Sequence, residues 1–308
     1  MPEINASLVK QLREQTGAGM MDCKRALTEV NGEVDQAIDW LRKKGLAAAA
    51  KKAGRIASEG LIGVAAQGTV GALVEVNAET DFVARNNDFQ NFTREIARLA
   101  VNVDGDINDL KNARLTIDGG TVAEQLIGMV GKIGENMVLR RSCALGVKEG
   151  IVATYTHNAV SEDLGKIGVL LALESDGEPN RLHELGRKIA MHVCAARPVA
   201  VDRGDLDPAL IQREREVLTE QASASGKSLE IVEKMVDGRL RKYYEEVVLG
   251  EQIYVVDGEN TVNKILEVAC KEIGASIRIV GFERYELGEG LEKREENFAV
   301  EVAAQIEN

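Results

Sequence analysis

The chain has 308 residues, of which 44% are hydrophobic and 29% are charged, and its formal net charge at pH 7 is −12. This balance is typical of a folded globular protein and argues against a disordered chain. The acidic net charge argues against a general nucleic-acid or membrane-surface binder, because both classes need a basic surface.

Residues 1–57 carry more Lys and Arg than Asp and Glu, unlike the rest of the chain, and they contain three short amphipathic helices. The first helix is predicted to begin at Asn5 or Ser7 and to end at Gly17, since glycine readily adopts the left-handed conformation of a helix C-terminus. The second presents its apolar side chains on one face: Met20, Cys23, Leu27 and Val30. The third is predicted to end at Gly45, before a basic helix or helical linker.

The middle of the chain contains a repeated unit of strand, strand and helix. The strand-like segments are 60–66 and 71–76 in the first copy and 150–156 and 168–173 in the second, about ninety residues later. Each copy ends in an amphipathic helix, near Val101 and near Cys194. This pattern predicts an α+β core in two halves, with antiparallel hairpins and helices on one sheet face. Between the halves, residues 102–121 are predicted to be irregular and residues 122–131 to be helical.

The turn after the second strand carries Phe82 among polar residues. Glu79, Thr80 and Asp81 interrupt the apolar alternation of the strand, and a new helix begins only after the capping residues that follow Arg85. A water-exposed aromatic ring is unfavourable, so Phe82 either packs into the core of its own chain or is buried by a partner. From composition alone, the core contact is the commoner outcome.

After Pro198, two helices with narrow apolar stripes are separated by a glycine-containing break at 223–227. The stripe residues are Leu210, Val217 and Leu218 in the first helix and Leu229, Val232, Val236, Leu240, Tyr243 and Val247 in the second. Two such stripes joined by a turn predict an antiparallel coiled-coil hairpin that interrupts the second half of the core. Strand-like composition returns at 253–256 and 277–282, on either side of a helix at 262–273.

The sequence contains no motif for a nucleotide or metal site. The glycine-rich segment 16–24 has the wrong spacing for a phosphate-binding loop and lies between helices, and 225–228 lacks the first glycine and the preceding strand. The three histidines are isolated, and the four cysteines are widely spaced without a Cys-x-x-Cys pair. We therefore expect no cofactor, no metal and no catalytic residue that a motif would reveal. A catalytic site assembled in space stays open.

Several segments together resemble the elongation factor Ts family, whose members are nucleotide exchange factors for elongation factor Tu. The most specific segment is Thr80-Asp-Phe-Val-Ala-Arg-Asn86. The others, in the family's order, are 8–13, 16–24, 132–136, 190–193, 233–238 and 288–293. The resemblance covers nearly the whole chain, and it implies that the first three helices form a module similar to the ubiquitin-associated fold.

The resemblance also implies which residues meet the partner. A wedge that displaces Mg²⁺ from the GTPase domain of elongation factor Tu is implied at Thr80, Asp81, Phe82 and Val83. Further partner contacts are implied at Met20, Lys24, Ile133, Gly134 and His157. Judged by the residues alone, a solvated lysine, a helix end and an exposed loop histidine explain Lys24, Ile133–Gly134 and His157 equally well.

The interpretation divides the chain into five parts. They are a three-helix module with its linker at 1–57, the two halves of the core at 58–148 and at 149–204 with 253–290, the coiled-coil insertion at 205–252, and a C-terminal helical module at 291–308. The sequence shows no signal segment and no run of apolar residues long enough to span a membrane, so we expect a cytoplasmic location.

The predicted function is that of an exchange factor rather than an enzyme. The protein would bind elongation factor Tu in its GDP-bound and nucleotide-free forms, with no direct nucleic-acid or membrane contact. A homodimer or a two-to-two complex, through the hairpin or the core, stays open. Two other classes also stay open. One is a scaffold that self-associates through the hairpin and binds a peptide through the first module, and the other is an enzyme with its site between the two core halves.

Overall fold

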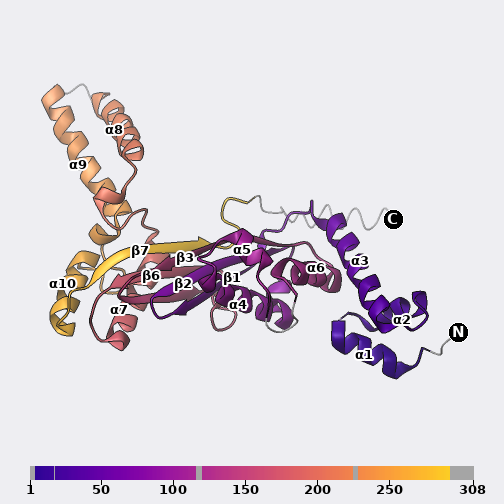
Figure 1. Ribbon diagram of the computed structural model, residues 1–308. Coiled ribbons are helices and arrows are strands. Elements are labelled where there is room, and N and C mark those ends of the chain that lie inside the picture. The colour runs from indigo at the N-terminus through magenta and orange to yellow at the C-terminus, as the bar shows by residue number, and fades with distance from the viewer. Residues whose placement is uncertain (1–3, 17, 116–119, 225–227, 292–308) are drawn as a thin grey trace.

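The computed structural model describes residues 4–16, 18–115, 120–224 and 228–291. The described chain combines helices with antiparallel sheets, which confirms the α+β fold class. Figure 1 shows an elongated molecule with the N-terminal helices at one end, the sheets with their covering helices in the middle, and a helical arm that projects near the other end. None of the described helices is both long enough and apolar enough to cross a membrane.

The N-terminal region consists of α1 (Ala6–Thr16), α2 (Met20–Glu29) and α3 (Val34–Lys52). Asn5 caps α1, because its side-chain oxygen accepts a hydrogen bond from the backbone N–H of Leu8 at 2.8 Å. The three helices bury a small shared core: Val9, Leu12, Cys23, Ala26, Leu27 and Ala37. The likeness of this region to the ubiquitin-associated fold stays a prediction, and Gly17 lies outside the described residues.

Two expectations for this region are wrong. Met20 is the first residue of α2 and is 59% exposed, so it does not share the apolar face of that helix. The third helix continues past Gly45, because one glycine costs a helix only about 1 kcal/mol and the alanines at 47–50 favour continuation. Gly45 instead allows close contact with α6 (Val122–Ile133): a Cβ built on Gly131 would lie 3.2 Å from the Cα of Gly45.

Two antiparallel sheets form the core. The first contains β1 (Glu59–Gln67), β2 (Val70–Ala78), β3 (Met137–Gly146) and β5 (Leu164–Gly165), in the order β3-β2-β1-β5. The second contains β4 (Gly150–His157), β6 (Ile167–Glu174) and β7 (Arg278–Glu286), in the order β4-β6-β7. The sheets pack face to face through a layer of apolar side chains that includes Ile62, Val64, Leu73, Val152, Leu170 and Ala172.

A helix covers the outer face of each sheet. Successive residues of a strand point to opposite faces, so the neighbours of the inward-facing residues face outward. In the first sheet, Leu61 and Val74 pack under α4 (Asn87–Asn102). In the second, Leu171 packs under α7 (Pro179–Ala196), and α10 (Val262–Ile273) packs against the same core. The repeated strand, strand and helix unit is present, with its two helices on the outer faces of two separate sheets.

The arm consists of α8 (Pro208–Ser223) and α9 (Leu229–Val247), which lie antiparallel as predicted (Figure 1). Its buried core is narrow: Leu218, Ala222, Val232, Val236 and Leu240. The face of α8 that meets α9 follows Ile211, Leu218 and Ala222, so two residues assigned to the stripe, Leu210 and Val217, are 43% exposed. Leu229, the first residue of α9, is 81% exposed and also lies outside the stripe.

Segments with mixed sequence patterns differ most from expectation. The sequence does not predict β3, whose apolar alternation is broken by Arg140 and Arg141, or the very short β5. The segment 102–121 contains a short helix, α5 (Ile107–Asn112), which Asp106 caps. The strand expected at 253–256 is wrong, because Ile253 forms a single bridge and a turn follows it. The division into five parts stays a prediction, and its last helix, predicted at 291–308, lies outside the described residues except for Leu291.

A buried carboxylate joins the end of the second sheet to the first sheet. After β7 the chain returns to the first sheet, where Glu75 of β2 is fully buried. The carboxylate accepts hydrogen bonds from Arg140 at 2.9 Å, from Arg141 at 2.6 Å and from the backbone N–H of Gly288 at 2.9 Å. An ionised carboxylate away from water needs such partners, so this cluster holds the chain in place after β7.

We expect Gly168→Ala to destabilise the protein. Gly168 lies on β6 against the layer between the sheets, and a Cβ there would lie 2.7 Å from a methyl group of Ile62 and 2.8 Å from one of Val64. Overpacking of this kind costs about 1–3 kcal/mol. Urea unfolding followed by circular dichroism measures the free energy of unfolding.

Gly238→Ala is the matched control for this substitution. Nothing lies within 4 Å of a Cβ built on Gly238 in α9, so alanine should stabilise the helix by roughly 0.5–1 kcal/mol. If Gly168→Ala were as stable as the unchanged protein, the close packing of the two sheets at Gly168 would be contradicted.

Candidate partner-binding site

The turn between β2 and α4 places a buried valine next to an exposed phenylalanine. Val83 is 3% exposed and packs in the core of the first half, whereas Phe82 is 74% exposed. Asp81, which precedes Phe82 in the chain, is also exposed. Of the two outcomes that the sequence leaves open for Phe82, packing into its own core is therefore wrong. The ring is available to a second molecule.

Hydrogen bonds to a second turn hold the N-terminal side of this turn. The backbone N–H and the side-chain hydroxyl of Thr80 donate to the carboxylate of Glu135, at 2.9 and 2.7 Å. Glu79 accepts a hydrogen bond from the backbone N–H of Asn136 at 2.6 Å. The segment after α3 joins them, since Arg55 forms an ion pair with Glu79 at 3.4 Å and its carbonyl accepts from the Asn136 amide at 2.8 Å.

A helix cap holds the C-terminal side of the same turn. The side-chain oxygen of Asn86 accepts hydrogen bonds from the backbone N–H groups of Asp88 at 2.9 Å and Phe89 at 3.2 Å. Between Phe82 and this cap, Val83–Arg85 form a single turn of 3-10 helix. Because the backbone is held on both sides, a partner can bury the ring with little loss of backbone entropy.

Ile133 and Gly134 lie beside this turn. Gly134 ends α6 with a φ of +90°, a left-handed conformation that favours glycine. The next residue is Glu135, which binds Thr80. Ile133 is half-buried against the core of the first half. The pair is thus both an ordinary helix end and a neighbour of the Phe82 turn.

The other candidate contacts lie elsewhere. His157 is exposed at the end of β4, and its Nδ1 lies 3.2 Å from the hydroxyl of Tyr155. The nearby Lys166 pairs with Glu59 at the start of β1, which puts His157 at the same end of the core as the turn after β2. Met20 and Lys24 are exposed on α2, which packs on α1 and α3 in the N-terminal region.

The described residues contain no group of three or more His, Cys, Asp or Glu side chains that could hold a metal ion. Burial raises the pKa of the Cys143 thiol to about 11, so this group is protonated at neutral pH and is a poor nucleophile. What the turn offers is an aromatic ring and a neighbouring carboxylate on a fixed backbone.

The sequence of the chain matches a known protein family. The family model described as Elongation factor TS matches residues 79–289, so its match begins at the Phe82 turn. The elongation factor Ts of Rhodospirillum rubrum is 61% identical over 307 residues, and that of Rhodospirillum centenum is 59% identical over 304 residues. Both alignments cover 99% of each chain. The chain belongs to the elongation factor Ts family.

A third member of the elongation factor Ts family, from Paramagnetospirillum magneticum, is 58% identical over 305 residues, covering 99% of this chain and 98% of its own. These alignments extend over the N-terminal helices, which the family model leaves out. Membership of the elongation factor Ts family places the chain among the elongation factors of protein biosynthesis.

Sequence reasoning missed the residues that support the Phe82 turn in this member of the elongation factor Ts family. Glu135 is 55 positions from Thr80, and Asn136 is 57 positions from Glu79. Hydrophobic periodicity gives no information on polar pairs so far apart. The available signal was the position of Glu135 and Asn136 directly after a glycine that ends a helix, where backbone and side chains are free to bind a neighbouring turn.

We expect the stability to fall in acid because of His192. Its Nδ1 accepts a hydrogen bond from the backbone N–H of Val255 at 3.2 Å, and its Nε2 lies 2.9 Å from an oxygen of Gln252. Burial lowers the pKa of His192 from its ordinary value of 6.5, so the unfolded chain binds the proton more readily than the folded chain. This stabilisation is complete above the unfolded-state pKa and is lost as the pH falls through the lower folded-state pKa.

Urea unfolding at a series of pH values between about 8 and 5 measures this effect. His192→Gln should reduce the dependence of the unfolding free energy on pH. His183→Gln, at an exposed position on the same helix, should retain it. An unchanged pH dependence in His192→Gln would assign the loss of stability in acid to other groups.

Proposed function

We propose that this member of the elongation factor Ts family is a guanine-nucleotide exchange factor, which binds elongation factor Tu and promotes GDP release so that GTP can bind. The observation that carries the proposal is the ring of Phe82, 74% exposed on a turn that is held on both sides. Exposed aromatic side chains on rigid backbone are typical anchors of protein interfaces. The family supports elongation factor Tu as the partner.

The proposed mechanism is a linkage between two ligands of elongation factor Tu. The exchange factor binds the nucleotide-free form more tightly than the GDP-bound form, so GDP and the factor weaken each other's binding by the same ratio. Phe82 enters the GTPase domain, and the carboxylate of Asp81 disturbs the groups that hold Mg²⁺. Loss of this cation weakens GDP binding because the phosphates lose their counter-charge. No covalent bond forms, so the protein is not an enzyme in this proposal.

Two other residues of the wedge, Thr80 and Val83, are not free to contact the partner directly. Val83 is buried in the core of its own chain, and the backbone N–H and hydroxyl of Thr80 both donate hydrogen bonds to Glu135. We therefore assign both residues to positioning Phe82 rather than to direct contact. This assignment refines the wedge that the sequence motif implies.

The other candidate residues would guide the approach of the partner. Ile133 and Gly134 flank the turn that binds Thr80, and His157 lies at the same end of the core. Met20 and Lys24 would form a separate contact from α2. The proposal keeps the five-part division of the chain, a cytoplasmic location, no cofactor and elongation factor Tu as the partner, with no direct contact to nucleic acid or membrane.

A scaffold function remains a second candidate because the arm exposes apolar side chains. Leu210, Val217, Leu229 and Ile231 are all exposed on α8 and α9. Such residues support self-association through the arm. Replacing residues 208–247 by a short Gly-Ser linker separates the two functions, because an exchange factor should keep much of its activity and a scaffold should lose all of it. Light scattering of the two forms would also reveal a homodimer or a two-to-two complex.

We expect Phe82→Ala to reduce stimulated GDP release at least tenfold, because an aromatic interface anchor contributes about 2 kcal/mol or more. The ring makes little contact with its own core, so the free energy of unfolding should change by less than about 0.5 kcal/mol. Stopped-flow fluorescence of labelled GDP leaving purified elongation factor Tu measures the rate.

Leu229→Ala provides a control with similar exposure. Leu229 is a large apolar side chain at the far end of the arm, so its removal should leave GDP release unchanged. Normal GDP release by a folded Phe82→Ala variant would reject Phe82 as the anchor.

We expect Glu135→Ala to slow GDP release several-fold without removing any residue of the wedge. The substitution leaves the N–H and hydroxyl of Thr80 without their acceptor, so the turn loses its preorganisation. Amide hydrogen exchange at Thr80 should become faster in the same variant. Glu135→Gln keeps one carbonyl acceptor, so its rate of GDP release should lie between the rates of Glu135→Ala and the unchanged protein. A full loss of activity in Glu135→Gln, with unchanged hydrogen exchange at the Thr80 amide, would indicate that Glu135 contacts the partner directly.

A further inference from the structure

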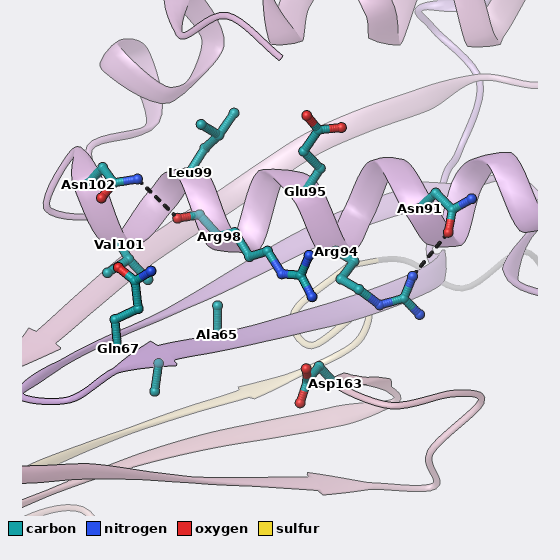
Figure 2. Close-up of a pocket in the computed structure, with 11 residues that line it drawn as sticks. Ala65, Gln67, Asn91, Arg94, Glu95, Arg98, Leu99, Val101, Asn102 and Asp163 are labelled. Atoms are coloured by element: carbon teal, nitrogen blue, oxygen red, sulfur yellow. Dashed lines mark hydrogen bonds between the residues drawn. The ribbon is translucent and has the colours of Figure 1, made fainter. Parts of the chain in front are cut away.

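A cleft lies between the C-terminal part of β1 and the helix α4. It encloses about 570 Å³ and is lined by residues 65–67 of the strand and by one side of the helix. Figure 2 shows the guanidinium groups of Arg94 and Arg98 extending from α4 toward the strand, with the carboxylate of Asp163 facing them. The cleft therefore combines the edge of a strand with two arginines of α4, and its lining also contains the acidic residues Glu95 and Asp163.

One edge of β1 is only half paired in the described chain. The short strand β5 pairs with Ile62 and Gly63, and Val64 donates its backbone N–H to the carbonyl of Asp163 at 2.9 Å. Backbone groups of alternate residues point to the same edge of a strand. The N–H and C=O of Ala66 therefore point to the same edge of β1 as those of Val64, which is the edge that β5 pairs with. Ala66 is exposed. The strand thus presents a free hydrogen-bonding edge directly beside the cleft.

The paired half of this edge indicates which chemistry the surface accepts. Leu164 and Gly165 pair with β1 as the short strand β5, and the turn 161–163 that precedes them carries polar side chains near α4. The hydroxyl of Ser161 accepts a hydrogen bond from Arg94 at 3.0 Å. Burial raises the pKa of Asp163, and the attraction of Arg94 and Arg98 opposes that rise. A backbone segment that accepts a hydrogen bond from the edge of β1 and carries an acidic side chain beside the arginines of α4 is therefore a ligand that this surface already binds within its own chain.

We propose that the free half of the edge, residues 65–67, binds an extended acidic peptide segment of another protein, which adds to the first sheet as a strand. The peptide exchanges backbone hydrogen bonds with Ala66, and an Asp or Glu side chain that points to α4 pairs with Arg98. Main-chain bonds to a sheet edge supply affinity in this mode of recognition, and side-chain contacts supply specificity. The small side chain of Ala65 leaves room for the peptide.

This site is separate from the turn that carries Phe82. It uses the end of β1 far from that turn and the middle of α4, whereas Phe82 precedes α4. The inference does not depend on the proposed exchange activity, and substitutions in the cleft should leave GDP release from elongation factor Tu unchanged. Failure of one proposal therefore leaves the other standing.

Fluorescence anisotropy with the full chain tests the proposal. The probe is an amidated peptide of sequence Thr-Val-Glu-Val-Thr that carries an uncharged fluorophore on its N-terminus, so that the glutamate is its single charge. We expect saturable binding that Arg98→Glu weakens about tenfold, equivalent to one charge-assisted contact. The same peptide with lysine in place of glutamate should bind Arg98→Glu more tightly than the unchanged protein. Arg187→Glu, at an exposed position on α7, is the control and should bind the original peptide normally.

Ala66→Pro tests the backbone contact separately from the charge. Proline removes the N–H that points to the free edge and leaves the bonds between β1 and β2 in place, so the variant should fold. Peptide binding should fall about tenfold, equivalent to the loss of a backbone hydrogen bond at the edge. In the unchanged protein, the peptide should slow hydrogen exchange at the Ala66 amide but not at the Ala65 amide, which points to β2.

Three outcomes would overturn the proposal. One is the absence of saturable peptide binding up to about 1 mM. Another is equal binding by Arg98→Glu and the unchanged protein. The third is complete competition by free glutamate or acetate at the concentration of the peptide, which would assign the cleft to small carboxylates instead of strands.

Discussion

The buried carboxylate of Glu75 is the interaction on which the arrangement of the core depends. It lies on β2, binds Arg140 and Arg141 of β3, and accepts the backbone N–H of Gly288 beyond β7. Removing one member of a buried ion pair typically costs about 3–5 kcal/mol, so these three segments are strongly held together. Since β2 leads into the Phe82 turn and β3 follows the turn that binds it, the same cluster determines where the two turns meet.

Much of the fold follows from patterns that lie within single segments. The hairpins of both halves, the helices after them and the two helices of the arm are all predictable, because each shows a regular apolar pattern within its own segment. The errors have a common physical origin. The sequence does not predict β3, because Arg140 and Arg141 interrupt its apolar pattern in order to bind the buried carboxylate of Glu75 on β2. The sequence predicts a helix end at Gly45, because the close contact between this glycine and α6 depends on a distant segment that the local pattern does not reveal.

The candidate site was predictable in its centre but not in its support. The sequence places Phe82 in a polar turn, but only the structure shows that Phe82 is exposed and that the adjacent Val83 is buried in the core. A local pattern identifies an unusual aromatic residue without saying which way the ring points. The partners of the turn, Glu135 and Arg55, come from distant segments whose meeting depends on the whole fold.

Helix α3 runs unbroken from the N-terminal region to the edge of the core. Its middle crosses α6 at Gly45, and just beyond its end Arg55 is bonded to the turn that carries Phe82. The exposed surface of α2 and the ring of Phe82 are thus mounted on one stiff spacer. A partner that contacts both surfaces would bind bivalently: once one contact has formed, the second forms within the same complex, at a high effective concentration. Spacer stiffness, as much as either contact, would then set the lifetime of the complex.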